Sequence, residues 1–268
     1  MELTLDNNRK FEQLSNIFQH VSSINDQYNI YFSKKGMFMQ GFDKTKISII
    51  EFSLVPTWFT SYQYNTDNES IVGINSKTLY KILNTKQDGQ KLKICYEADS
   101  DFLKIIFDKS SETKSENKVC KKDFKMALIE LDEEILTIPD DEQEVEFVIE
   151  QSIFSTNIDN LLMFDDTVNF KINNEFINLS SSGMEGDMEV TMDTDNLEEF
   201  SADECEDDQF LIDQNYALKY IKYICNFSKV SKLMYIKVSN DRPLCCIYKI
   251  SDTDNSYLRF YLAPKEKE

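Results

Sequence analysis

Glycine, proline and histidine are scarce in this chain of 268 residues, which contains 6 Gly, 4 Pro and 1 His. So few glycines and prolines argue against a Gly-rich phosphate loop and against low-complexity linkers. The single histidine, His20, has no recognisable nucleophile as a partner, so we expect no enzyme and no cofactor. No apolar run approaches ~18 residues, and the opening residues lack the basic and apolar regions of a signal peptide. We therefore expect a soluble, intracellular protein with no membrane segment.

Metal-binding motifs are also missing. The six cysteines show no CxxC spacing, and Cys245 and Cys246 are adjacent in an apolar strand, where they point to opposite faces. Reduced core thiols are the favoured interpretation. The acidic stretch 202–209 lacks the glycine and the alternating oxygen ligands of a calcium loop, which favours a solvated loop. No metal site is predicted.

Basic residues are outnumbered, because 29 Lys and Arg stand against 48 Asp and Glu, for a net charge of −19. An evenly spread charge of this sign argues against nucleic acid as a partner. The bases nevertheless gather on predicted helical segments at 9–24, 76–86 and 215–232, whereas segment 151–164 carries only Asp159. This polarised pattern would attract phosphates at one surface and repel them elsewhere. The alternative is that lysines simply prefer helix surfaces.

Apolar residues follow one pattern twice. Hydrophobic residues make up 41% of the chain, which is enough for two cores. Two of the predicted helices are 76–86, with Ser76 as N-cap, and a later one that begins near Asn215, and both are followed by alternating strands. The first helix has an apolar stripe at steps of three and four residues. The stripe consists of Phe11, Leu14, Ile17, Phe18, Val21 and Ile24. We interpret the chain as an internal duplication of a helix–strands–helix–strands unit.

The stretch ELDEEILTIPDDEQE, residues 130–144, lies at the seam between the two copies. Its acidic run is interrupted by apolar residues from Ile135 to Pro139, which an ordinary solvated linker would not carry. One interpretation is the start of a strand, although Pro139 argues against a central one. The favoured interpretation is an exposed docking segment for a partner.

Six blocks resemble the proliferating cell nuclear antigen family over nearly the whole chain. They are GMFMQGFDKTKISII, GINSKTLYKIL, LIELDEEILTIP, NYALKYIKY, RPLCCIYKI and SYLRFYLAPK. The resemblance implies an α+β fold of two similar clamp domains, at 1–129 and 145–268, joined by a connecting loop at 130–144. It also implies that three chains join head to tail into a ring around duplex DNA, with helices facing the hole.

By this resemblance, bases on the inner helices contact DNA loosely and without base readout, which suits a sliding protein. The expected DNA-binding residues are Arg9, Lys10, Lys77, Lys81, Lys86, Lys219, Lys222 and Lys229.

Several helix positions depart from the family. Where the family has inward bases, this chain has Ser15, Asn16 and Ser22 in the first helix, and Thr156 and Asp159 in the third. We therefore expect DNA binding that is weaker, or less evenly distributed over the helices, than is usual in the family.

The resemblance also implies an apolar pocket that takes an aromatic side chain of a partner's peptide, which adds a strand to the C-terminal APK segment. Phe42 is bulkier than the methionine typical of the family, which suggests a shifted partner preference. The expected pocket residues are Phe42, Lys46, Ile47, Ile49, Leu136, Ile138, Pro139, Pro243, Tyr261, Ala263 and Pro264.

In the family, a strand before the connecting loop pairs with an edge strand of the next subunit. Opposite charges on the two strands would favour this pairing and oppose the pairing of identical edges. Independent surface charge is the alternative. The expected interface residues are Lys118, Lys121, Lys122 and Lys125 on one strand, and Glu185, Asp187, Glu189 and Asp193 on the other.

The sequence thus predicts a non-enzymatic DNA sliding clamp and polymerase processivity factor. Its expected partners are duplex DNA, DNA polymerase and other proteins with clamp-binding peptides, and a clamp loader; its expected state is a homotrimer. The expected location is the nucleus, or a viral replication compartment for a viral member. The alternatives are a monomeric, dimeric or heterotrimeric checkpoint-type subunit of the same fold, and an acidic peptide-docking scaffold that does not enclose DNA.

Overall fold

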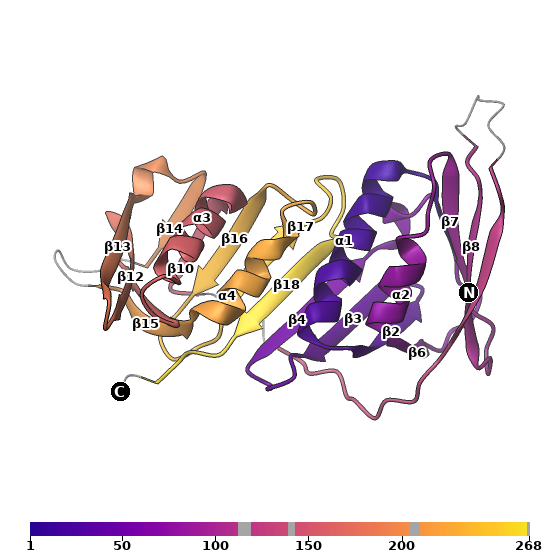
Figure 1. Ribbon diagram of the computed structural model, residues 1–268, viewed down its shortest axis with the longest axis horizontal. Helices are drawn as coiled ribbons and strands as arrows, with labels where there is room; N and C mark the ends of the chain where they lie inside the picture. Colours follow the sequence, from indigo (N-terminus) through magenta and orange to yellow (C-terminus); the bar gives the residue numbers. More distant parts are fainter. Residues whose placement is uncertain (112–118, 139–142, 204–209, 267–268) are drawn as a thin grey trace. The chain divides into compact units, whose positions relative to one another are not determined.

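A computed structural model describes residues 1–111, 119–138, 143–203 and 210–266 of the chain. The chain forms two compact units. The first consists of Met1–Lys44, Glu51–Leu136 and Ile250–Leu258, and the second of Thr45–Ile50, Thr137–Lys249 and Arg259–Glu268. Figure 1 shows that each unit combines two helices with strands.

The first half of the chain contains two helices and nine strands among its described residues. A short 3₁₀ turn at Pro56–Trp58 precedes β5. The elements are β1 (Glu2–Leu5), α1 (Asn8–Ile24), β2 (Gln27–Ser33), β3 (Gly36–Phe42), β4 (Ser48–Leu54), β5 (Ser61–Gln63), β6 (Ser70–Asn75), α2 (Ser76–Leu83), β7 (Gln90–Cys95), β8 (Phe102–Lys109) and β9 (Lys122–Ala127).

The second half repeats this order. Short 3₁₀ turns at Thr194–Asn196 and Cys225–Phe227 precede β14 and follow α4. The elements are β10 (Val145–Glu150), α3 (Gln151–Leu161), β11 (Thr167–Ile172), β12 (Phe176–Gly183), β13 (Gly186–Asp193), β14 (Glu199–Ala202), β15 (Ile212–Ala217), α4 (Leu218–Ile224), β16 (Leu233–Val238), β17 (Leu244–Lys249) and β18 (Tyr257–Leu262).

Strand pairing repeats as well. In the first unit β1 pairs antiparallel with β5 and β7, while β2 pairs with β3 and β6. In the second, β10 pairs with β14 and β16, while β11 pairs with β12 and β15. The same order with the same pairing confirms the duplication predicted from the sequence, and the α+β fold of two similar domains.

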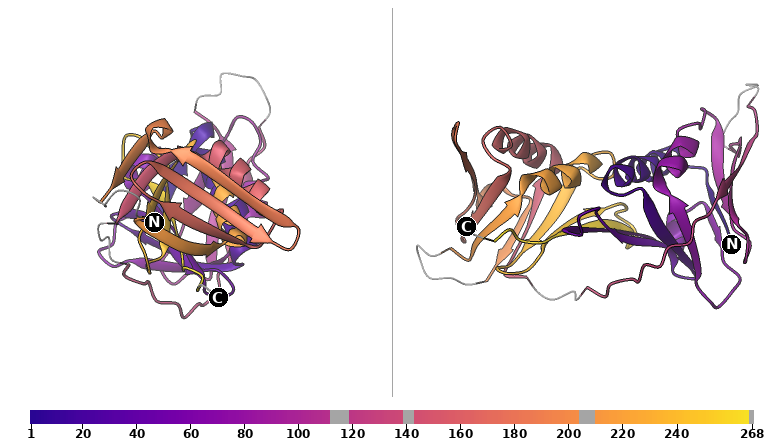
Figure 2. Two further views of the ribbon diagram at one scale, coloured as in Figure 1. Left: turned by 90° about the vertical axis from the view of Figure 1, so that its left-hand side faces the viewer. Right: turned by 60° about the horizontal axis from the view of Figure 1, so that its bottom comes forward.

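The helices lie side by side in each unit, α1 with α2 and α3 with α4 (Figure 2). The six apolar residues predicted for the stripe of α1 are all buried. Phe18 of this stripe meets Phe52 of β4 edge to face, with ring centroids 5.8 Å apart. Burying one such side chain contributes roughly 1.5–3 kcal/mol, so the stripe holds α1 to its sheet.

Three details of the predicted elements were wrong. The N-cap of α2 is Asn75, whose side chain accepts the amide proton of Thr78 at 2.9 Å, and not Ser76. Residues from Asn215 to Ala217, predicted to begin the last helix, belong to β15. The apolar residues of segment 151–164, Ile153 among them, predict one buried helix face, but Ile153 of α3 is 51% exposed. Short polar residues cap helices from just outside them, so a cap and its neighbour are easily confused.

Candidate functional sites

The connecting segment between the domains has no strand or helix over Leu128–Ile138. This excludes a strand that begins at Leu136. Side chains of the first unit hold the segment by its backbone: Asn29 donates to Leu131 O at 3.2 Å and Tyr31 OH to Glu133 O at 3.3 Å. Leu136 in the same segment is 41% exposed, whereas Leu131 is half-buried.

Gln40 of β3 makes the tightest contact with this segment. Its amide nitrogen donates to Leu136 O at 3.0 Å, and its amide oxygen accepts from Leu136 N at 2.8 Å. The same nitrogen donates to Glu51 at 3.0 Å. Phe42, two residues along β3, is half-buried and belongs to the same unit.

Most predicted pocket residues lie in the second unit, where one hydrogen bond joins two of them. The amide of Ala263 donates to Ile47 O at 3.1 Å, and Ile47 is 41% exposed. Lys46, just before it, has a φ of 60°, so the turn into β4 is tight. The remaining members are half-buried Ile49, Ile138 and Pro264, exposed Pro243, and buried Tyr261, while Pro139 lies outside the described residues.

The C-terminal segment is held at two further points. Lys265 N donates to Asn215 O at 2.7 Å, and Lys265 Nζ contacts Asp166 at 3.1 Å and Thr167 Oγ1 at 2.5 Å. The Thr167 hydroxyl, and then Lys265, hold the pKa of Asp166 below its usual value. An extended segment fixed along one side leaves its other side for an added strand.

The predicted DNA-binding bases of the first unit differ in their freedom. Arg9 and Lys81 are exposed. Lys10 donates to Trp58 O at 2.7 Å, and Lys77 pairs with Asp26 at 2.9 Å. Lys86 lies just beyond the end of α2, where it donates to Asn8 at 2.9 Å and lies 4.7 Å from the ring centroid of Phe11. Burial lowers the pKa of Lys86.

The predicted DNA-binding bases of the second unit also include both an exposed lysine and a paired one. Lys219 of α4 is exposed, whereas Lys222 pairs with Asp159 of α3 at 2.6 Å. Lys229 is exposed but lies beyond α4 and the turn that follows it, so its placement on a helix was wrong. Four of the predicted bases thus make an ion pair or a hydrogen bond among the described residues: Lys10, Lys77, Lys86 and Lys222. The other four make neither: Arg9, Lys81, Lys219 and Lys229.

Two polar residues of α1 do not lie on the open helix face that the resemblance to the family implies for them. Asn16 is 4% exposed and Ser22 is 8% exposed, so neither lies on an open helix face. Gln13 on the same helix is also buried, and its side chain donates to Ile250 O at 3.1 Å. The buried surface of α1 is thus wider than its apolar stripe, and at Gln13 it meets segment Ile250–Leu258 of the same unit.

Strands β9 and β13 each lie at the edge of a sheet. Among the described residues, each pairs with a strand on one side only. Along β13 the side chains alternate, and the acidic ones share the exposed face with Glu185 just before the strand. The exposed acids are Glu185, Asp187, Glu189 and Asp193.

The lysines around β9 do not form a single row. Lys121 and Lys125 are exposed, whereas Lys122 points to the opposite face and its ammonium donates to Thr85 O. Asp123 lies on the face of Lys125 and pairs with Lys104 at 3.5 Å. The predicted lysine-rich edge is therefore mixed in charge, and Lys118 lies outside the described residues.

Several predictions concern side chains without a binding role. No group of three or more His, Cys, Asp or Glu among the described residues could hold a metal ion. Cys225, Cys245 and Cys246 are core thiols as expected, but Cys95 is half-buried and Cys120 exposed. Most of the acidic stretch 202–209 lies outside the described residues.

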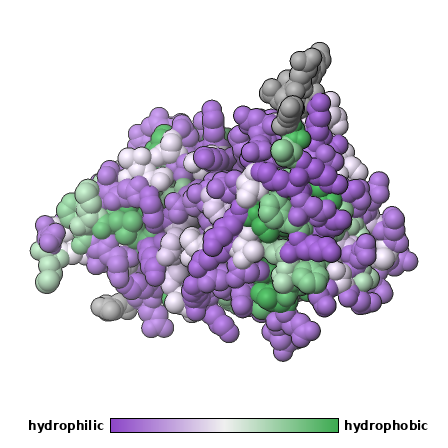
Figure 3. Space-filling view, turned by 45° about the vertical axis from the view of Figure 1, so that its right-hand side comes forward, coloured by the Kyte–Doolittle hydropathy of each residue, from purple (hydrophilic) through white to green (hydrophobic). Residues whose placement is uncertain are grey.

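Of the described helices, none has the length and hydropathy of a membrane span. Figure 3 shows a largely hydrophilic face with separate apolar patches.

Two copies of one α+β unit, each with paired helices and an open edge strand, define a two-domain DNA clamp. The sequence profile of "Proliferating cell nuclear antigen, N-terminal domain" matches residues 3–135, and that of the C-terminal domain matches residues 137–265. The chain belongs to the proliferating cell nuclear antigen family of DNA sliding clamps, which act as polymerase processivity factors.

Similar proteins come from eukaryotes and from a virus. Proliferating cell nuclear antigen 1 of Plasmodium falciparum is 28% identical over 262 residues, which cover 94% of this chain and 93% of the relative. The protein of the same family name from Chaetomium thermophilum is 27% identical over 260 residues, 96% of both chains. A probable DNA polymerase sliding clamp 2 of Paramecium bursaria Chlorella virus 1 is 23% identical over 259 residues, 96% of this chain and 89% of the relative.

Proposed function

We propose that three copies of this chain close head to tail into a ring around duplex DNA. The observation that carries the proposal is the pair of open edges, β9 in one unit and β13 in the other. An edge that pairs with a different edge of the next chain generates a closed ring when the rotation fits. The acidic face of β13 opposes the pairing of two β13 strands with each other.

Exposed bases on the helices supply loose phosphate contacts inside this ring. Of the predicted bases, Arg9, Lys81 and Lys219 lie on helices, are exposed and make no ion pair or hydrogen bond among the described residues, although Lys219 lies 5.7 Å from the ring centroid of Tyr220. Lys229, just beyond α4, is a further exposed base of this kind. Phosphate contacts position a protein on DNA without reading its sequence, so the ring slides. The chain contributes binding and no catalysis. An ATP-driven clamp loader opens and closes the ring.

The outer surface tethers DNA polymerase and other proteins through a peptide that docks at the connecting loop, residues 130–144. Leu136 of the connecting segment is 41% exposed, which supports an apolar docking surface there. The unpaired side of the segment from Ala263 to Lys265 adds the strand of the partner. The relatives from eukaryotes and a virus support the nucleus or a viral replication compartment as the site of action.

The test is polymerase processivity on a primed circular template with the loader present. Lys81→Glu with Lys219→Glu should shorten the products, because the reversed charges repel phosphates inside the ring. The matched control is Lys34→Glu with Lys35→Glu, which makes the same charge change at the turn between β2 and β3. Equal activity of both double variants would reject DNA contact by the helices. Stimulation on circular DNA that is lost on linear DNA with free ends would support enclosure, and an absence of DNA-dependent stimulation would favour the scaffold alternative.

A further inference from the structure

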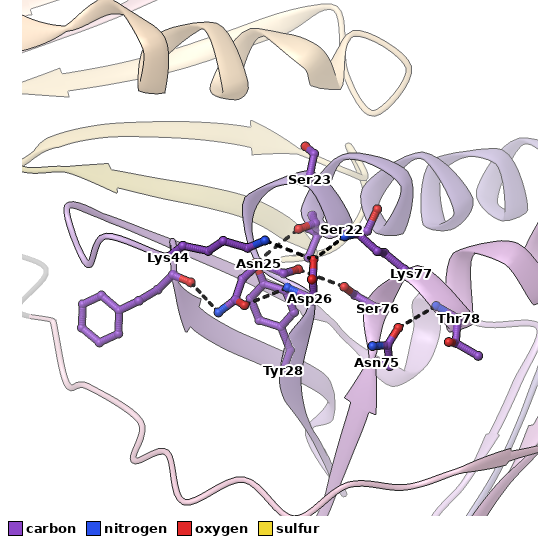
Figure 4. Close-up of polar contacts among 12 residues, drawn as sticks. Ser22, Ser23, Asn25, Asp26, Tyr28, Lys44, Asn75, Ser76, Lys77 and Thr78 are labelled. Carbon is purple, nitrogen blue, oxygen red and sulfur yellow. Dashed lines mark hydrogen bonds and ion pairs between the residues drawn. The ribbon is translucent and has the colours of Figure 1, made fainter.

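Asp26 lies between two lysines in the first unit, at the junction of α1 and β2. Its carboxylate is 2.9 Å from Lys77 Nζ and 3.5 Å from Lys44 Nζ (Figure 4). Lys77 lies in the first turn of α2 and Lys44 in the turn after β3, so the carboxylate contacts bases from two separate segments. One carboxylate thus partly neutralises two bases at the end of the helix pair.

The backbone around Asp26 fixes this position. Ser76 N donates to Asp26 O at 2.8 Å, and Asp26 N donates to the side chain of Asn25 at 2.7 Å. Ser76 Oγ also donates to Asn25 O at 2.9 Å, so the start of α2 is tied to the end of α1 (Figure 4). The hydrogen bond from Lys77 lowers the pKa of Asp26.

A second carboxylate, in the other unit, neutralises one lysine. Asp159 of α3 contacts Lys222 of α4 at 2.6 Å, across the helix pair. Both pairs are open to solvent: the lysine side chains are 52% and 35% exposed and the aspartates 35% and 48%. Exposed ion pairs of this kind are weak and exchange readily with another anion.

We propose that Asp26 and Asp159 compete with DNA phosphates for Lys77, Lys44 and Lys222. This inference rests on the proposed function, because it requires these helices to face DNA. A phosphate that approaches must displace a carboxylate that is already in place, so each phosphate interaction is weak and short-lived. The competition keeps the grip on DNA weak even at bases that could bind tightly, and this favours sliding over arrest.

The experiment measures equilibrium binding of the full-length protein to a labelled short duplex over a series of NaCl concentrations. Asp26→Asn and Asp159→Asn remove the competing charge while they keep the side-chain shape. Each should tighten binding by about two- to fivefold, the strength of an exposed ion pair. The slope of log K against log salt should steepen by ~0.9 for each additional phosphate that the protein neutralises.

The matched control is Asp67→Asn, which frees Lys34 from a pair at 2.5 Å and makes the same charge change away from the helices. Asp159→Asn combined with Lys222→Ala should abolish the tightening. The inference is overturned if Asp26→Asn and Asp159→Asn behave like Asp67→Asn, or if the tightening survives Lys222→Ala. Thermal unfolding of each variant verifies that it is folded.

Failure of the proposed function gives a different result. If Lys81→Glu with Lys219→Glu weakens duplex binding while the aspartate variants match Asp67→Asn, only the competition is wrong. If the lysine reversal also leaves duplex binding unchanged, the helices do not face DNA and both proposals fail together.

Discussion

Gln40 and Leu136 are joined by hydrogen bonds in both directions, at 3.0 and 2.8 Å, so one buried side chain satisfies both backbone groups of a residue in an otherwise irregular segment. The amide of Gln40 reproduces the pairing of a β-strand without a second strand. Because its backbone groups are satisfied, the segment keeps one conformation while Leu136 remains 41% exposed. This explains how an apolar side chain stays outside the core.

Gln40→Ala should release the segment at Leu136. Hydrogen exchange of the Leu136 amide should accelerate by about thirtyfold, since two net hydrogen bonds of roughly 1 kcal/mol each disappear. Asn29→Ala is the control, because it removes the bond to Leu131 O and leaves both bonds at Leu136 in place. Unchanged exchange at Leu136 in Gln40→Ala would show that the segment is held by other contacts.

Gly73 of β6 should tolerate no side chain. A Cβ at this position would lie 2.0 Å from Ile129 O, and the carbonyl of Gly73 already accepts from Ile129 N at 3.0 Å. Gly73→Ala should therefore lower the free energy of unfolding by about 1–3 kcal/mol, as other overpacked sites do. Urea unfolding measures this against Ile71→Ala, a change at a 57% exposed neighbour. Equal losses in the two variants would contradict the account.

The ion pair of Asp166 and Lys265 predicts a pH dependence. The pKa of Asp166 is lowered in the folded protein, chiefly by the Thr167 hydroxyl and then by Lys265. The wild type should therefore be more stable than Asp166→Asn above about pH 4, and the difference should vanish as the pH falls through the lowered pKa. It should stay below ~1 kcal/mol because the pair is exposed. Urea unfolding at several pH values tests this, and a difference that grows with acidity has the wrong sign.

The edges β9 and β13 predict a rescue by charge exchange. Glu189→Lys with Asp193→Lys should dissociate the ring, because the reversed face repels the lysines of β9. Adding Lys121→Glu and Lys125→Glu should restore it. Asp252→Lys with Asp254→Lys makes the same net change in a loop outside both strands and should leave the mass unchanged. Sedimentation reads out each state, and a ring that survives the first pair would reject charge-guided pairing.

Local pattern and chain order were sufficient to predict the helix stripe and the duplication. The shortest strands, β1, β5 and β14, carry too few residues for a pattern. The partners of the bases could not be predicted, because Lys77 meets Asp26 and Lys10 meets Trp58 only after folding. The contact of Gln13 with Ile250 O likewise depends on a segment far along the chain. Tertiary contacts, not local propensity, decide which bases remain free.

Solution mass by light scattering at low and high salt tests whether three chains form a closed ring. We expect a mass near three times 31.4 kDa at low salt. High salt should loosen the ring only in part, because the charges are screened while the apolar side chains of β9 and β13 still pair. A monomer or a dimer at every salt concentration would contradict the homotrimer and require another explanation for processivity.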